Sequence, residues 1–323
     1  MPSVDSSASG VIAVIGEALI DFVPAGPGLF AAAPGGSPAN VAVGLARLGV
    51  HARMLARLSG DPLGQMVRAH LEANGVDLAH AVRAAEPTSL AIVALGPDGG
   101  PAYDFRVAGT ADWQWRDAEL ADALEGGVAA LHTGSLAATT QPGADAIGRL
   151  LERARPQATI SYDPNCRPLL MGAPEQVRGR IEALVALADV VKVSSEDLAW
   201  LLPGQTPEQV LADWLARGPA LVAVTLGPDG VVAMGRSAGL LRRPGRRVTV
   251  VDTVGAGDSF MSALLAGLGT RGLLGALHRD ALAAADANTL AAVLDQAVLA
   301  SAITCSRRGA NPPTWEELAK GLE

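Results

Sequence analysis

The sequence predicts an α/β protein whose mostly parallel sheet is covered by helices on both faces. Short apolar runs of the kind that form buried strands alternate with helical stretches along the chain. The strand-like runs lie at 11–16, 129–132, 158–162, 190–193 and 221–226. The intervening helical stretches include 144–154, 174–187 and 207–216. Alternation of this kind is typical of parallel strands that are connected by helices.

The first helix is expected between Ser37 and Gly49. Ser37 has a side chain suited to an N-cap, Pro38 suits the first turn, and Gly49 suits the end of the helix. Between them, Val41 and Leu45 belong to one apolar stripe. This pattern predicts a helix with one apolar face.

A β-hairpin is expected where two strand-like segments, 88–95 and 102–107, flank the turn-forming segment 96–101. Side chains alternate between the two faces of a strand, so Phe105 and Arg106 are expected on opposite faces. On pattern alone, this hairpin is either an ordinary edge of the main sheet or a separate element.

Composition limits the class of protein. The net charge of −8 argues against nucleic acid as a partner, and no apolar run reaches the ~18–20 residues of a membrane span. Residues 1–10 lack the features of a signal peptide and are expected to form a disordered tail before a folded domain at 11–315. Two cysteines make no disulfide framework, and we expect a cytoplasmic protein.

The most informative segment is a glycine loop that opens a helix, Gly255-Ala256-Gly257-Asp258. Free backbone N–H groups and the positive end of the helix dipole suit a phosphate or a developing oxyanion. A carboxylate such as Asp258 would repel that anion, unless it accepts a proton from an attacking hydroxyl group. The loop therefore predicts phosphoryl transfer to an alcohol.

Any nucleotide must be held without a P-loop. The chain has two lysines, Lys192 and Lys320, and neither follows a glycine. Backbone amides, arginine and metal ions are left to bind the phosphates. The histidines have no metal-ligand spacing, so a zinc site is not expected.

Several motifs resemble those of the ribokinase-like (PfkB) carbohydrate kinases, in the order found in that family. The two family signatures are matched by 35–42 (Gly-Gly-Ser-Pro-Ala-Asn-Val-Ala) and by 252–258 (Asp-Thr-Val-Gly-Ala-Gly-Asp). Segments 16–21, 109–112 and 163–167 are similar to the fructokinase branch. The agreement covers nearly the whole chain. It implies a ribokinase-like fold and ATP-dependent phosphorylation of a primary hydroxyl group, with fructose favoured as the sugar.

The resemblance also implies roles for individual residues. Asp258 would be the base, and the amides of Gly255, Ala256 and Gly257 would stabilise the transferring phosphoryl group. The residues expected to contact the sugar are Asp21, Gly36, Asn40, Phe105 and Arg167. Those expected to contact ATP are Ser194, Thr225, Gly227 and Gly230.

Two metal ions are implied in the same way. Relatives use an Asn-x-x-Glu motif to organise Mg²⁺ through water, and here Ser194 and Asp197 occupy those positions, with Glu196 as an alternative acid. A K⁺ site is implied next to Asp252 and is completed by mostly backbone oxygens. The other residues of that site are Val254, Arg307 and Gly309.

The resemblance further implies a small β lid, built from about 19–34 and 88–110, that covers the sugar and can form a homodimer contact. If Phe105 faces the sugar, Arg106 points away from it. The pocket then has Arg167 as its main cation, which favours a neutral ketohexose over an aldonic acid.

Other functions remain as alternatives. Within the family they are 2-keto-3-deoxygluconate kinase, or another small-sugar or nucleoside kinase. A different class is a sugar-binding protein without catalysis. A serine esterase and a dinucleotide-dependent dehydrogenase are disfavoured, because Gly257-Asp258-Ser259 lies late in the chain and Phe260 takes the place of a third glycine.

Overall fold

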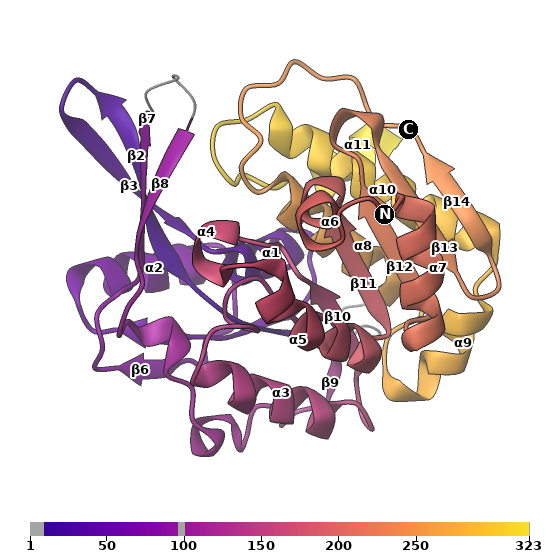
Figure 1. The fold of residues 1–323 in the computed structure, drawn as a ribbon, viewed down its shortest axis with the longest axis horizontal. Coiled ribbons are helices and arrows are strands. Elements are labelled where there is room, and N and C mark those ends of the chain that lie inside the picture. Colours follow the sequence, from indigo (N-terminus) through magenta and orange to yellow (C-terminus); the bar gives the residue numbers. More distant parts are fainter. Residues whose placement is uncertain (1–9, 96–100, 323) are drawn as a thin grey trace.

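Within residues 10–95 and 101–322, which the computed structural model describes, eight strands form one main sheet (Figure 1). In spatial order the strands are β14 (Gly239–Arg243), β13 (Val231–Gly235), β12 (Leu221–Thr225), β11 (Val190–Ser194), β10 (Thr159–Asp163), β9 (Val128–Gly134), β1 (Val11–Ile15) and β4 (Ala52–Leu55). Neighbours from β12 to β4 pair in parallel, whereas β13 pairs in antiparallel with both of its neighbours, β12 and β14. The predicted mostly parallel sheet is confirmed.

Both faces of this sheet are buried against helices. Alternate side chains of β1 enter two different apolar cores: Ile12 and Val14 lie in one, and Ala13 and Ile15 lie in the other. Helices that contribute to the first core include α1 (Ser37–Arg47), α2 (Pro62–Ala73), α8 (Ala256–Gly269), α9 (Arg279–Ala284) and α10 (Ala287–Cys305). Helices that contribute to the second include α3 (Gly143–Ala154), α5 (Pro174–Leu187), α6 (Ser195–Leu201) and α7 (Pro207–Arg217).

In the described part of the chain, a second sheet of four strands stands apart from the main one, at the upper left of Figure 1. Its order is β3 (Leu29–Gly35), β2 (Leu19–Gly26), β7 (Leu90–Leu95) and β8 (Pro101–Arg106). The expected hairpin is present as β7 and β8, and its turn at 96–100 lies outside the described residues. The hairpin therefore does not form an edge of the main sheet.

Some elements differ from the expectations. A short parallel pair, β5 (Arg57–Ser59) with β6 (Val82–Ala84), was not expected from the sequence. The folded chain also continues past 315, since α11 (Trp315–Leu322) packs on α10 through the fully buried Leu318. Of the expected tail 1–10, residues 1–9 lie outside the description.

Helix α10 is the one described helix that is long and apolar enough to cross a membrane, by length and composition. More than half of it is buried in the fold. It makes its largest contact with α8, and Leu290, Val293 and Leu294 are fully buried in the first core. These are the properties of a central core helix, and the long contact fixes α8 against the sheet.

Candidate active site

A large cleft opens at the carboxyl ends of β9, β10, β11 and β12 and extends to the second sheet. Its volume is about 1240 Å³. It contains every predicted catalytic, sugar-binding and ATP-binding residue, together with Val254, Glu196 and Asp197. The end of a parallel sheet is where α/β proteins commonly bind ligands.

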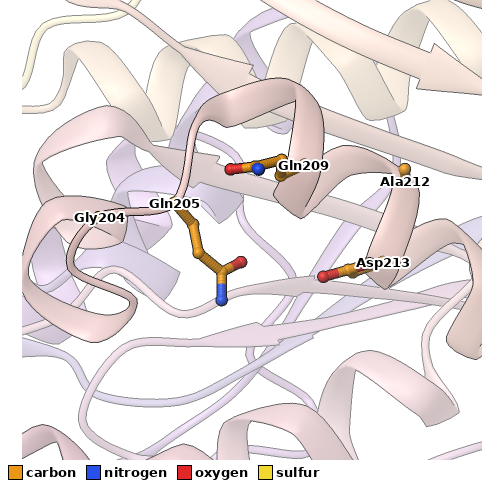
Figure 2. A pocket seen from close by; sticks show the side chains of 5 residues that line it. All are labelled: Gly204, Gln205, Gln209, Ala212 and Asp213. Carbon is orange, nitrogen blue, oxygen red and sulfur yellow. The ribbon is translucent and has the colours of Figure 1, made fainter.

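A second, smaller hollow lies beside the N-terminal part of α7, where Gln205, Gln209 and Asp213 line it (Figure 2). The amides of Gln205 and Gln209 and the carboxylate of Asp213 are its polar side chains. None of the site residues predicted from the sequence lines this hollow.

The glycine loop forms the start of α8, as predicted. Gly255 has a φ of 76° and is the residue before the helix, and a Cβ on it would lie 2.6 Å from the Cβ of Ala310. Only glycine fits both requirements. In the described part of the chain, the amides of Gly255 and Gly257 donate to no acceptor, whereas that of Ala256 donates to the carbonyl of Thr253 at 3.2 Å. The amides of Gly255 and Gly257 are thus available to an anion.

The Asp258 carboxylate lies at this loop and is held by the first helix. Ser37 Oγ donates to Asp258 Oδ1 at 2.6 Å, and Asn40 Nδ2 donates to Oδ2 at 2.8 Å. Burial raises the pKa of Asp258, although these two hydrogen bonds oppose the rise. A buried carboxylate with a raised pKa is a suitable proton acceptor.

Two local expectations for this region change. The N-cap of α1 is Gly36 and not Ser37. The Ser37 hydroxyl instead donates a hydrogen bond to Asp258, 221 residues away in the sequence. Asn40, expected to contact the sugar, lines the cleft, but its amide nitrogen donates a hydrogen bond to Asp258. Its side-chain carbonyl oxygen remains as an acceptor.

The end of the cleft next to the second sheet, where the sugar is expected, is built around Asp21. A Cβ on Gly35 would collide with the Asp21 carboxylate, and a Cβ on Gly36, whose φ is 101°, would lie 2.6 Å from the carbonyl oxygen of Glu17. The two glycines therefore allow a close approach between β2 and the start of α1. Burial raises the pKa of Asp21 to about 6, while nearby Arg167 lowers it and Asp258 raises it.

Phe105 lines the same end of the cleft from the second sheet, together with Val23, Ala91 and Val93. Arg106 is on the opposite face of β8: its side chain is 67% exposed and its Nη2 donates to Asp104 Oδ2 at 2.6 Å. The predicted strand register is confirmed, since Arg106 points away from the cleft.

The end of β10 and the segment after it carry two charged side chains, Asp163 and Arg167, of which Arg167 lines the cleft. Asp163 Oδ2 accepts a hydrogen bond from Lys192 Nζ at 2.8 Å, and both side chains are almost fully buried. Arg167 lines the cleft, and its Nη1 donates to Asn165 Oδ1 at 2.8 Å and to the Cys166 carbonyl at 2.9 Å. Lys192 was not predicted as a site residue.

Asp197, the carboxylate expected to organise Mg²⁺, also makes hydrogen bonds that hold the fold together. Asp197 Oδ1 accepts from the Cys166 amide at 2.9 Å, and Ser194 Oγ accepts from the Asp197 amide at 3.0 Å. Asp197 is buried, whereas Glu196 is exposed in the cleft. Because each carboxylate oxygen can accept more than one hydrogen bond, Asp197 can still bind a metal-bound water.

The turn between β12 and β13 forms another part of the cleft, where ATP is expected. Thr225, Gly227 and Gly230 lie in the cleft as expected, and the two glycines have φ values of 58° and 95°. The sequence reasoning did not identify the opposite wall, which the loop after β14 and the last turns of α10 supply. Its residues are Arg246, Arg247, Val248, Val250, Val298, Ser301, Ala302 and Cys305.

Of the expected K⁺ residues, Val254 lines the cleft, and Asp252 joins it to Gly309 beside the glycine loop. Asp252 Oδ1 accepts from the Val254 amide at 3.1 Å, and Oδ2 accepts from the Gly309 amide at 2.8 Å. Asp252 thus joins the start of the loop to the chain after α10. The Arg307 side chain is engaged elsewhere, in an ion pair with Glu317 at 2.7 Å.

A glycine loop at a helix start, a buried carboxylate and a cleft at the ends of parallel strands are the parts of an alcohol phosphotransferase. The chain belongs to the pfkB family of carbohydrate kinases, whose family model matches residues 11–317. The resemblance seen in its motifs is confirmed.

Individual relatives agree with this assignment. The chain is 36% identical to a fructokinase of Klebsiella pneumoniae over 90% of this chain and 96% of that one. Its fold superimposes on fructokinase from Xylella fastidiosa with bound ATP, with a TM-score of 0.88, 30% identity, and coverage of 96% and 97%. A fructokinase double mutant from Vibrio cholerae O395, in a form with bound fructose, ADP and potassium ion, gives a TM-score of 0.83 at 27% identity, with coverage of 98% and 99%.

Proposed function

We propose that this chain is an ATP-dependent fructokinase that converts fructose to fructose 6-phosphate. The observation that carries the proposal is the placement of the buried Asp258 carboxylate beside the free amides of Gly255 and Gly257, inside a cleft that also holds Asp21. The fructokinases to which the chain is similar support fructose as the acceptor.

The sugar would bind at the end of the cleft next to the second sheet. Asp21 and the Asn40 carbonyl oxygen would accept hydrogen bonds from its hydroxyl groups, and Gly36 would let the backbone approach it. Phe105 would cover its apolar face, and Arg167 would lie near the transferred phosphoryl group. Because Arg106 points out of the cleft, a neutral ketohexose suits this pocket better than an aldonic acid.

The reaction would be an in-line displacement. The oxygen of the primary hydroxyl group attacks the γ-phosphorus of ATP, and the bond from that phosphorus to the bridging oxygen of ADP breaks. The hydroxyl proton passes to the Asp258 carboxylate. The amides of Gly255 and Gly257, which Ala256 connects at the start of α8, hold the charge on the phosphoryl oxygens.

ATP would lie along Ser194, Thr225, Gly227 and Gly230, with its phosphates pointing to the glycine loop. The residues of the cleft fit a water-bound Mg²⁺, because the oxygen acceptors Asp197 and Glu196 face it. When bound, this ion neutralises phosphate charge.

A K⁺ ion near Asp252, with backbone oxygens of Val254, Arg307 and Gly309, would hold the glycine loop in its anion-binding shape.

The second sheet would act as the lid, comprising about 19–34 and 88–110. Closure over the sugar would exclude water and so prevent transfer to solvent. Leu29 and Phe30 at its tip are 64% and 50% exposed, and they would form the homodimer contact. We place the enzyme in the cytoplasm.

A coupled assay of ADP release with a panel of sugars tests this function. The panel contains fructose, 2-keto-3-deoxygluconate, ribose and a nucleoside, and each is also tested for binding by calorimetry. We expect release with fructose. Preferred release with another member would identify a different kinase of the family, and sugar binding without release would identify a binding protein.

A further inference from the structure

Lys192 is a buried cation that the mechanism above does not use. It lies in β11 on the face of the sheet that α8 covers, and its side chain is only 4% exposed. A lysine between buried valines is costly to bury unless its charge has a partner. It nevertheless lines the cleft.

The ammonium group lies against the glycine loop. A Cβ placed on Gly257 would lie 2.9 Å from Lys192 Nζ, so the second glycine of the loop leaves room for this nitrogen. The amide of Gly257 is also available to an anion. Lys192 Nζ thus lies beside a residue of the loop whose amide is available to an anion.

The hydrogen bonds of Lys192 leave donors for a ligand. Among the described residues, Nζ donates to one acceptor, Asp163 Oδ2, at 2.8 Å. An ammonium group has three N–H donors. The other two nearby carboxylates are engaged elsewhere, since Asp197 accepts from backbone amides and Asp258 accepts from Ser37 and Asn40.

Lys192 keeps its charge in this position. Burial alone would lower the pKa of Lys192, but Asp163, Asp197 and Asp258 raise it further than burial lowers it. A permanently charged group is suited to bind phosphate oxygens and is not suited to exchange a proton.

We propose that Lys192 is a catalytic residue that binds the phosphoryl group in transfer, with its free N–H donors directed at the same oxygens as the amides of Gly255 and Gly257. Asp163 positions it. This inference rests on the proposed function, because it assumes that the reaction is phosphoryl transfer from ATP. It also accounts for how a chain without a P-loop lysine brings a fixed positive charge to the phosphate.

The competing explanation is that Lys192 only neutralises the buried Asp163. Replacing one partner of a buried ion pair can unfold a protein, because the other charge is left uncompensated. The test therefore uses the double variant K192M/D163N, which removes both charges together. The matched control is K320M, because Lys320 is the only other lysine and lies on α11 away from the cleft.

The kinetic test compares kcat and KM for fructose. Removing one donor from a preorganised oxyanion site costs on the order of 10²–10³-fold in kcat. We expect that loss in K192M/D163N, with the KM for fructose changed by less than about threefold, and no loss in K320M. A kcat within about threefold of the wild type in the folded double variant would overturn the proposal.

The binding test separates contact with the phosphoryl group from a structural role. We expect K192M/D163N to bind ADP as the wild type does, but to bind ADP with aluminium fluoride, which mimics the phosphoryl group in transfer, about 10²-fold more weakly. Equal loss for both ligands, or for neither, would overturn the proposal.

A direct observation does not depend on activity. The chain has two lysines, so ¹³Cε labelling of lysine gives two side-chain signals that K320M assigns. We expect the Lys192 signal to shift on addition of ADP with beryllium fluoride, and to shift much less with ADP alone. An unchanged signal would overturn the proposal. Failure of every sugar in the ADP-release assay would instead overturn the proposed function and leave this measurement valid.

Discussion

Replacement of Asp258 by asparagine is the most direct test of the proposed reaction. The substitution keeps the shape of the side chain and removes the proton acceptor. The surrounding groups can adapt to it: the Ser37 hydroxyl can accept as well as donate, and the Asn40 amide can turn to present its oxygen. The geometry of the site is therefore expected to survive.

The expected loss comes from the base alone. General-base catalysis contributes about 10²–10⁴-fold in rate, which corresponds to about 2.7–5.5 kcal/mol of transition-state stabilisation. Fructose binding should change much less, because Asp21 and Arg167 remain. Turnover is measured by ADP release and fructose affinity by calorimetry, with Asp229→Asn, on the exposed turn after β12, as the matched control.

Stability should not account for the loss. Burial raises the folded-state pKa of Asp258, so at neutral pH the ionised carboxylate destabilises the fold and a neutral amide relieves that effect. The melting temperature of Asp258→Asn should equal or exceed that of the wild type. A variant that keeps about a tenth or more of the wild-type turnover would show that Asp258 is not the base.

Three further predictions concern pH, ions and specificity. Burial raises the pKa of Glu17 from 4.5 to about 7, so its neutral form stabilises the fold at low pH and this stabilisation is lost as pH rises through about 7. Glu17→Gln should therefore raise the unfolding free energy by up to about 3 kcal/mol near pH 8 and by little near pH 4, in urea titrations; equal effects at both would contradict the burial argument. Wild-type turnover should be faster in K⁺ than in Na⁺ or a bulky organic cation, and Asp252→Asn should remove the difference; a wild type indifferent to the cation would refute the K⁺ site. Fructose should have a kcat/KM at least about tenfold above that of 2-keto-3-deoxygluconate, and Arg106→Ala should alter neither by more than about twofold; the opposite ranking would refute the pocket argument.

Local patterns in the sequence were sufficient for the main architecture. Strands of the parallel sheet read as short apolar runs because both faces of that sheet are buried. The start of α8 could be located because a glycine with positive φ and a following apolar stripe leave little choice of structure. The side of β8 that carries Arg106 followed from strand alternation alone.

Other features depended on contacts between distant segments. The hairpin formed by β7 and β8 could not be assigned to a sheet until β7 was seen to pair in parallel with β2. Strands β5 and β6 are too short for their pattern of apolar residues to predict a strand pair. The wall made by Val250 and Ser301 has no motif, because an apolar or small residue on a loop or helix carries no mark of its neighbours.

The sequence by itself determined the class of chemistry: a glycine loop, a carboxylate and no P-loop lysine define the groups available for phosphoryl transfer. Only the tertiary structure decided how those groups act on one another. Ser37 and Asn40 hold Asp258 from positions 221 and 218 residues away, and Lys192 reaches Asp163 and Gly257 across two neighbouring elements. The physical reason is that the pKa of a carboxylate and the charge of a buried lysine depend on burial and on partners within a few ångströms, and folding alone creates both.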